Sequence, residues 1–153
     1  MKTSEKTYEI LNDLIQINND RIEGYERAAK ETASEDSDLR SIFLSMASES
    51  RRYVNELTQY VSRGGEEPAQ GTTGRGKIYR AWMDVKATFT GKNRKAILAS
   101  CEYGEDAAQK AYEDALSTDA ELPAEIRQLI TDQKSSLKAS HDKIRRMRDT
   151  QPA

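Results

Sequence analysis

Apolar residues recur at intervals of three and four along most of the chain, which is the spacing of one face of an α-helix. The pattern predicts five helices, separated by stretches rich in glycine, serine, aspartate or proline. Their expected ranges are about residues 5–30, 38–63, 77–90, 93–117 and 123–148. Four of these helices are long, so we predict an all-α four-helix bundle that forms a single domain over residues 1–153.

The connections between the four long helices indicate how they are arranged. The first two are joined by a short turn, as are the last two, so each pair should be antiparallel. Residues 64–92 join the two pairs and contain the short helix, and five of the eight glycines lie between Gly64 and Gly76. A connection of this length can run along the whole bundle, so the second and third long helices should be parallel. Gly64 and Gly65 should end the second long helix with a left-handed cap.

Charge and composition exclude several classes of partner. The 24 basic and 26 acidic side chains are mixed along the chain, so no strong field of one sign is available for binding nucleic acid. No apolar run reaches the roughly 18 residues of a membrane helix, and the first nine residues lack the layout of a signal peptide. A single cysteine, Cys101, cannot form an internal disulfide bond. We therefore expect a cytoplasmic protein that binds neither nucleic acid nor membrane.

Polar residues interrupt the apolar stripes of three helices. At about 100° per residue, Asn18, Glu105 and Gln133 fall near the middle of their stripes and should point inward. An unpaired buried polar group costs about 1–3 kcal/mol, so these side chains need partners. Helical bundles also build their cofactor sites in this way, from one polar group on each helix directed to a shared interior.

Four further polar residues lie beside the stripes. Glu49 is on the flank of the second long helix, and Arg52 lies further round it. An ionised carboxylate such as Glu105 needs a cation or several donors inside a core, and Arg52 is the nearest cation by depth along the bundle. Glu102 and His141 are also flanking positions. The predicted polar network therefore consists of Asn18, Glu49, Arg52, Glu105 and Gln133.

The spacing of these residues resembles that of the ferritin superfamily. In ferritin-like di-iron proteins, the first helix supplies a Glu soon after a Leu-Asn pair, and the second supplies Glu-x-x-His before a Gly-Gly end. The matching positions here are Leu11-Asn12, Asn18, Glu49, Arg52 and Gly64-Gly65. The resemblance implies that Asn18 replaces a ligand Glu and Arg52 a ligand His. Arginine cannot ligate a metal because it has no free lone pair at neutral pH.

The similarity is greater to one uncharacterised bacterial branch of that superfamily. It rests on four stretches of sequence, which are Glu23-Gly24-Tyr25, residues 80–84 (Arg-Ala-Trp-Met-Asp), Gly104-Glu105-Asp106 and His141-Asp142. The resemblance implies a ferritin-like bundle of unknown molecular function, sometimes linked to stress responses, and suggests a homodimer.

Three functional hypotheses follow. In the first, the protein is not an enzyme and holds no cofactor; the polar network replaces a lost di-metal centre, and function lies in a homodimer or a protein partner. In the second, Glu49, Glu102, Glu105 and His141 hold iron or manganese for oxidation or storage. In the third, an exposed Trp82 docks on a partner, although the spacing of its helix favours an inward position.

Overall fold

The computed structural model describes residues 4–32, 37–74, 77–88 and 94–150. Over these residues the chain forms the helices α1 (Glu5–Glu31), α2 (Ser37–Arg63), α3 (Lys77–Thr88), α4 (Arg94–Leu116) and α5 (Ala124–Asp149), and no strand. The all-α prediction is confirmed. Each predicted helix end that falls on a described residue agrees with the observed end to within one residue. The predicted helix end at 90 and start at 93 lie outside the described residues. None of the described helices has the length and apolar composition needed to cross a membrane.

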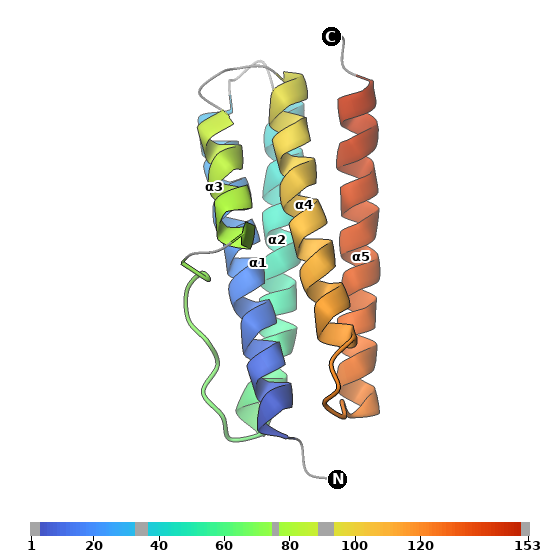
Figure 1. The fold of residues 1–153 in the computed structure, drawn as a ribbon. Helices are drawn as coiled ribbons and strands as arrows, with labels where there is room; N and C mark the ends of the chain where they lie inside the picture. The colour runs from blue at the N-terminus through green and yellow to red at the C-terminus, as the bar shows by residue number, and fades with distance from the viewer. Residues whose placement is uncertain (1–3, 33–36, 75–76, 89–93, 151–153) are drawn as a thin grey trace.

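The four long helices lie side by side, with the short α3 against the upper part of the bundle (Figure 1). Helices α1 and α5 run in one direction, whereas α2 and α4 run in the other (Figure 1). The segment after α2 climbs beside α1 to the start of α3, which packs on α1 and α4. The predicted parallel arrangement of the second and third long helices is therefore confirmed.

Helix ends follow from local sequence. The Ser4 hydroxyl accepts a hydrogen bond from the Thr7 backbone N–H and so caps the start of α1. At the end of α2, Gly65 has a φ of 77°, and the next residue, Glu66, donates its N–H to the Val61 carbonyl. Together with the bond from Gly65 N–H to the Ser62 carbonyl, this is a Schellman motif. The predicted left-handed cap is present.

Polar residues of α1 fix the crossover segment along the bundle. The Asn12 amide accepts a hydrogen bond from the Ala69 N–H at 2.8 Å and donates one to the Glu67 carbonyl at 3.3 Å. Two turns further, the Asp20 carboxylate accepts bonds from the N–H and the hydroxyl of Thr73, at 3.0 and 2.7 Å. These contacts hold the segment against α1 and place the start of α3.

The apolar core is divided into two clusters. The cluster near the start of α1 and the end of α2 includes Leu11, Ile15, Leu57 and Ile130. The cluster near the end of α1 and the start of α2 includes Tyr25, Phe43, Leu98 and Ile144. On each long helix, polar residues lie between the members of the two clusters, so a polar layer crosses the middle of the bundle.

Trp82 of α3 lies in the second cluster and is completely buried. Two glycines make room for it: a Cβ atom added at Gly24 of α1 would lie 2.8 Å from the indole, and one at Gly104 of α4 would lie 3.0 Å from it. The indole also packs against the Tyr25 ring, with centroids 5.0 Å apart. The hypothesis of an exposed Trp82 is wrong, because this side chain closes the gap between α1 and α4.

Candidate functional site

The inward face of α1 carries two polar residues at the level of the polar layer. A row of buried residues follows alternating steps of four and three: Thr7, Leu11, Leu14, Asn18, Arg21, Tyr25, Ala28 and Thr32. This spacing keeps one seam of a helix turned toward its partners in a bundle. Asn18 and Arg21 therefore both project into the interior, and Arg21 is fully buried.

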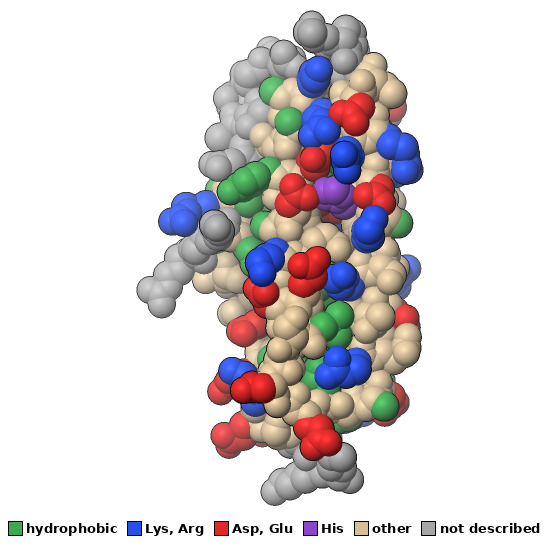
Figure 2. Space-filling model, turned by 45° about the vertical axis from the view of Figure 1, so that its right-hand side comes forward, with side chains coloured by type: hydrophobic (Ala, Val, Ile, Leu, Met, Phe, Trp, Pro, Cys, Tyr) green, Lys and Arg blue, Asp and Glu red, His purple; other side chains and the backbone are tan. Residues whose placement is uncertain are grey.

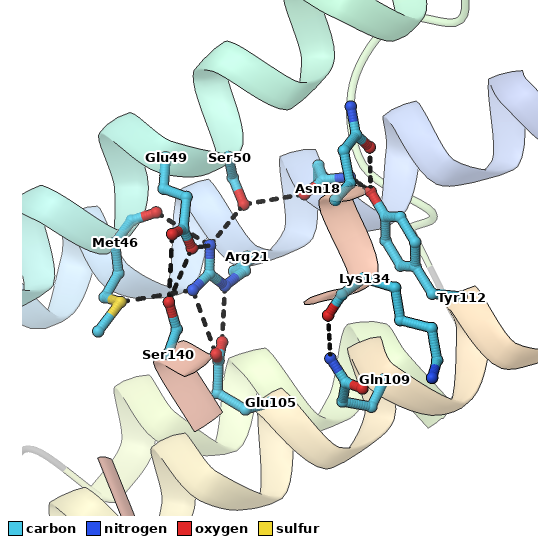
Figure 3. Close-up of polar contacts among 11 residues, drawn as sticks. Asn18, Arg21, Met46, Glu49, Ser50, Glu105, Gln109, Tyr112, Lys134 and Ser140 are labelled. Carbon is cyan, nitrogen blue, oxygen red and sulfur yellow. Dashed lines mark hydrogen bonds and ion pairs between the residues drawn. The ribbon is translucent and has the colours of Figure 1, made fainter. Parts of the chain in front are cut away.

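The Arg21 guanidinium is the centre of the layer (Figure 3). Its Nε and Nη2 donate to the two oxygens of Glu105 on α4, at 2.6 and 3.1 Å. Its Nη1 donates to the Met46 carbonyl at 3.1 Å and to the Ser50 hydroxyl at 2.9 Å, and lies 2.9 Å from an oxygen of Glu49. Nη2 also lies 3.5 Å from the Met46 sulfur. All five N–H groups thus face a partner, and the side chain joins α1 to α2 and α4.

The negative charges of neighbouring carboxylates keep Arg21 protonated. Burial by itself would lower the pKa of Arg21, but the negative charge of Glu105, with a smaller contribution from Glu49, raises that pKa above its ordinary value. One positive charge is therefore shared by two carboxylates in the interior. Because both Arg21 and Glu105 are 1% exposed, water cannot replace either partner of the pair.

Neutral side chains continue the network across the bundle. Ser50 donates its hydroxyl hydrogen to Oδ1 of the Asn18 side chain at 2.9 Å, and Nδ2 of the same side chain donates to the Tyr112 hydroxyl oxygen at 2.8 Å. The Tyr112 hydroxyl donates to Oε1 of the Gln133 side chain at 2.7 Å, and Nε2 of that side chain donates to the Glu56 carboxylate at 3.0 Å. Each residue accepts a hydrogen bond from the residue before it and donates one to the next, so the bonds polarise one another. The chain connects all four long helices.

The predicted network residues take different positions. Asn18, Glu105 and Gln133 lie in the buried layer, and Glu49 contacts Arg21 from the flank with 22% of its side chain exposed. Arg52 lies elsewhere: it is exposed, and its guanidinium sits 5.3 Å from the centre of the Tyr53 ring. This corrects the expectation that Arg52 neutralises Glu105.

The reason lies in the geometry of α2. Ser50 is the inward residue of α2 at this height, and its small side chain leaves room for the Arg21 side chain arriving from α1. Arg21, Ser50 and Tyr112 were missed as network members. A signal for Arg21 was present, since it lies one turn from Asn18, but arginine is rarely fully buried and Ile22 beside it fitted the apolar stripe.

The four predicted metal ligands do not meet at one point. Glu49 and Glu105 both contact Arg21 within the bundle. Glu102 and His141 approach each other on the outer side of α4 and α5, where their ligand atoms lie within 4.8 Å. The interior residues do not fit a di-metal group, because the Arg21 guanidinium already pairs with both carboxylates that a metal ion would need as ligands.

Comparison with known proteins gives a match to a family model. The family described as Domain of unknown function (DUF2383) matches residues 6–118, which span α1 to the end of α4 and include Arg21, Glu49 and Glu105. No curated protein matches the chain. Since the match covers most of the sequence, the chain belongs to the DUF2383 family.

Proposed function

We propose that this protein is a non-catalytic, ferritin-like bundle in which the Arg21 guanidinium stands in for the metal centre, and that it acts by binding a protein partner. The observation that carries the proposal is the double hydrogen bond between Arg21 and Glu105 inside the polar layer. A buried carboxylate requires a compensating cation, and in ferritin-like di-iron proteins that cation is the metal. Here a side chain of the protein meets the same requirement.

The second hypothesis, an iron or manganese site for oxidation or storage, has less support. It needs Glu49 and Glu105 to be free to ligate, and both are paired with Arg21. A metal ion entering between them would have to displace a guanidinium that is anchored in α1 and bound at all of its donors. The expected result is therefore an interior without metal.

Metal analysis of purified protein tests this part of the proposal. Cells are grown in medium rich in iron and manganese, and wild-type protein is compared with Glu49→Gln and Glu105→Gln. We expect no stoichiometric metal that depends on either carboxylate, and no oxygen consumption on adding Fe²⁺. Stoichiometric metal that is lost in Glu49→Gln would overturn it, because that side chain lies on the flank and its amide should not disrupt the fold.

The surface offers a groove suited to a partner. It lies between α1 and α4 below the start of α3 and has a volume of about 940 Å³. Its apolar lining includes Ile10, Leu14, Ile17, Ile78 and Ala111. A contiguous apolar surface on a soluble protein commonly marks an interaction site. The groove is therefore where we expect the contact.

The groove's charges favour a second copy of the same chain as the partner. Its lining carries both signs, with Lys6, Asp13 and Asp119 beside the pair Lys110–Asp114, which is joined within the chain at 3.0 Å and exposed enough to exchange partners. In a two-fold dimer the same patch meets itself, so basic groups of one copy can pair with acidic groups of the other. We include a role in stress responses in this proposal, because the sequence resembles a branch of the superfamily that is sometimes linked to them.

Light scattering after size-exclusion chromatography tests the dimer. We expect wild-type protein to be dimeric, and Ala111→Arg to be monomeric because the added side chain fills the groove. Ala99→Arg is the matched control, since Ala99 is an exposed residue of the same helix outside the groove. A wild-type monomer, or a dimer that survives Ala111→Arg, would show that this groove does not bind a second copy.

A further inference from the structure

A histidine and two carboxylates meet on the outer face formed by α4 and α5. Glu102 and Asp106 lie one turn apart on α4, and His141 faces them from α5. One ligand atom from each of the three lies within 4.8 Å of the other two. Figure 2 shows the chain's single histidine, in purple, with acidic side chains on several sides of it.

The imidazole ring is held in one orientation. Its Nδ1 lies 3.1 Å from the carboxylate of Asp142, and its Nε2 lies 2.5 Å from the carboxylate of Asp106. A neutral imidazole carries one N–H and one lone pair. With the hydrogen on Nδ1 donated to Asp142, the lone pair of Nε2 points toward Asp106. At 2.5 Å, only a proton fits between Nε2 and the Asp106 carboxylate, and a metal ion can replace it once that carboxylate moves away.

The surrounding groups stabilise this geometry. The His141 side chain is only 14% exposed, so packing limits its movement. Lys138 holds the Asp142 carboxylate at 3.0 Å, and Arg148 holds an oxygen of Glu102 at 2.6 Å. A carboxylate behind the second nitrogen of a ligating histidine is the common outer-shell arrangement of metal sites. Asp142 supplies that group here.

We propose that Glu102, Asp106 and His141 form a binding site for a divalent transition-metal ion of the zinc class. His141 Nε2 and one oxygen from each carboxylate are the ligands, with water completing the coordination. The mixed nitrogen and oxygen set favours Zn²⁺, Co²⁺ or Ni²⁺ over Mg²⁺ and Ca²⁺, which prefer oxygen alone. The site is separate from Arg21 and does not depend on the proposed function.

Charge and mobility are compatible with this assignment. The carboxylates of Glu102, Asp106, Asp142 and Asp149, set against Lys138 and Arg148, leave a net charge of −2 around a neutral imidazole. Two ligands of one zinc ion lie about 3.3 Å apart when metal–ligand bonds are about 2.0 Å in tetrahedral geometry. Asp106 must therefore move away from Nε2 when a metal replaces the proton. Its side chain is 59% exposed, so nothing in the core opposes that movement.

Titration of untagged, full-length protein with Zn²⁺ and Co²⁺ tests the site, by calorimetry and by the visible absorption of bound Co²⁺. We expect one ion per chain and an increase in the thermal unfolding midpoint, because the ion binds the folded state across α4 and α5. His141→Asn and Asp106→Asn should each lower the affinity at least about 10-fold, and Asp142→Asn should lower it about 10-fold by releasing the ring.

Glu49→Gln is the control that separates this proposal from the previous one. It should leave Zn²⁺ and Co²⁺ binding unchanged, because Glu49 lies at the interior layer and not at this face. Absence of saturable binding, or binding that survives both His141→Asn and Asp106→Asn, overturns the site. Metal lost in Glu49→Gln but retained in His141→Asn instead overturns the arginine-filled interior. Circular dichroism of each variant establishes that the fold is intact.

Discussion

Arg21 and Glu105 form a two-point pair, with Nε–Oε1 and Nη2–Oε2 distances of 2.6 and 3.1 Å, deep between α1 and α4. Neither side chain reaches water, so each depends on the other for its charge to be stable in the core. Removing one partner should therefore cost far more than replacing both by apolar groups. This asymmetry provides a direct way to test the polar layer.

Arg21→Met should lower the free energy of unfolding by about 3–5 kcal/mol, because it leaves two carboxylates in the interior without their cation. Chemical denaturation gives the value. Arg52→Met is the matched control: its guanidinium is exposed, so the same substitution should change stability by no more than about 0.5 kcal/mol. Equal losses in the two variants would mean that Arg21 has no special role.

Combining Arg21→Met with Glu105→Leu should recover much of the lost stability. Both charges of the pair are then absent, while Glu49, which is partly exposed, can turn toward water. A double-mutant cycle should give a coupling energy of about 2–3 kcal/mol between the two positions. Additive effects of the two single substitutions would contradict a direct pair.

Tyr112→Phe should destabilise the protein by about 1–3 kcal/mol, since it leaves one Asn18 amide hydrogen and the Gln133 side-chain oxygen without their partner. The other Asn18 amide hydrogen keeps its bond to the Leu14 carbonyl. Tyr103→Phe serves as the control because Tyr103 lies on the same helix and is 55% exposed. Thermal and chemical unfolding of both variants compare them. A neutral Tyr112→Phe would show that the chain of hydrogen bonds contributes no stability.

Gly24→Ala should destabilise the protein by about 1–2 kcal/mol. The new methyl group would lie 2.8 Å from the Trp82 indole, which also abuts Gly104 and so has little room to move. Trp82 is the only tryptophan, so a red shift of fluorescence reports its displacement. In a Trp82→Leu background the same alanine should be neutral or stabilising by up to about 1 kcal/mol, because alanine favours the helix. An equal loss in both backgrounds would exclude the steric explanation.

Cys101 should react with a thiol reagent only after unfolding. Burial, and then the charge of Glu105, raises the pKa of its thiol well above the ordinary value. Above about pH 8.5 the unfolded chain ionises this thiol while the folded chain keeps the proton. Stability should therefore fall as pH rises from there, by up to about 1.4 kcal/mol per pH unit, and Cys101→Ala should reduce this slope. Rapid reaction of the folded protein with the thiol reagent would contradict the burial of Cys101.

The sequence alone was sufficient to determine the helices and their arrangement. Spacing of apolar residues locates each helix, Gly64 and Gly65 end α2, and the length of the crossover makes α2 and α4 parallel. The inward positions of Asn18, Glu105 and Gln133 were also predictable. A polar residue in the middle of an apolar stripe has neighbours one turn away on both sides that define its direction.

Only the tertiary structure decided which cation enters the core. Arg21 and Ile22 are about 100° apart on α1, and hydrophobicity alone turns Ile22 inward. In the folded chain, Ile22 is half-buried and lines a surface hollow beside Pro68 and Ala69 of the crossover, so it lies on the outer side of α1. That leaves the inward position to Arg21. The meeting of Glu102 with His141 likewise depends on how α4 and α5 align, which spacing within one helix does not determine.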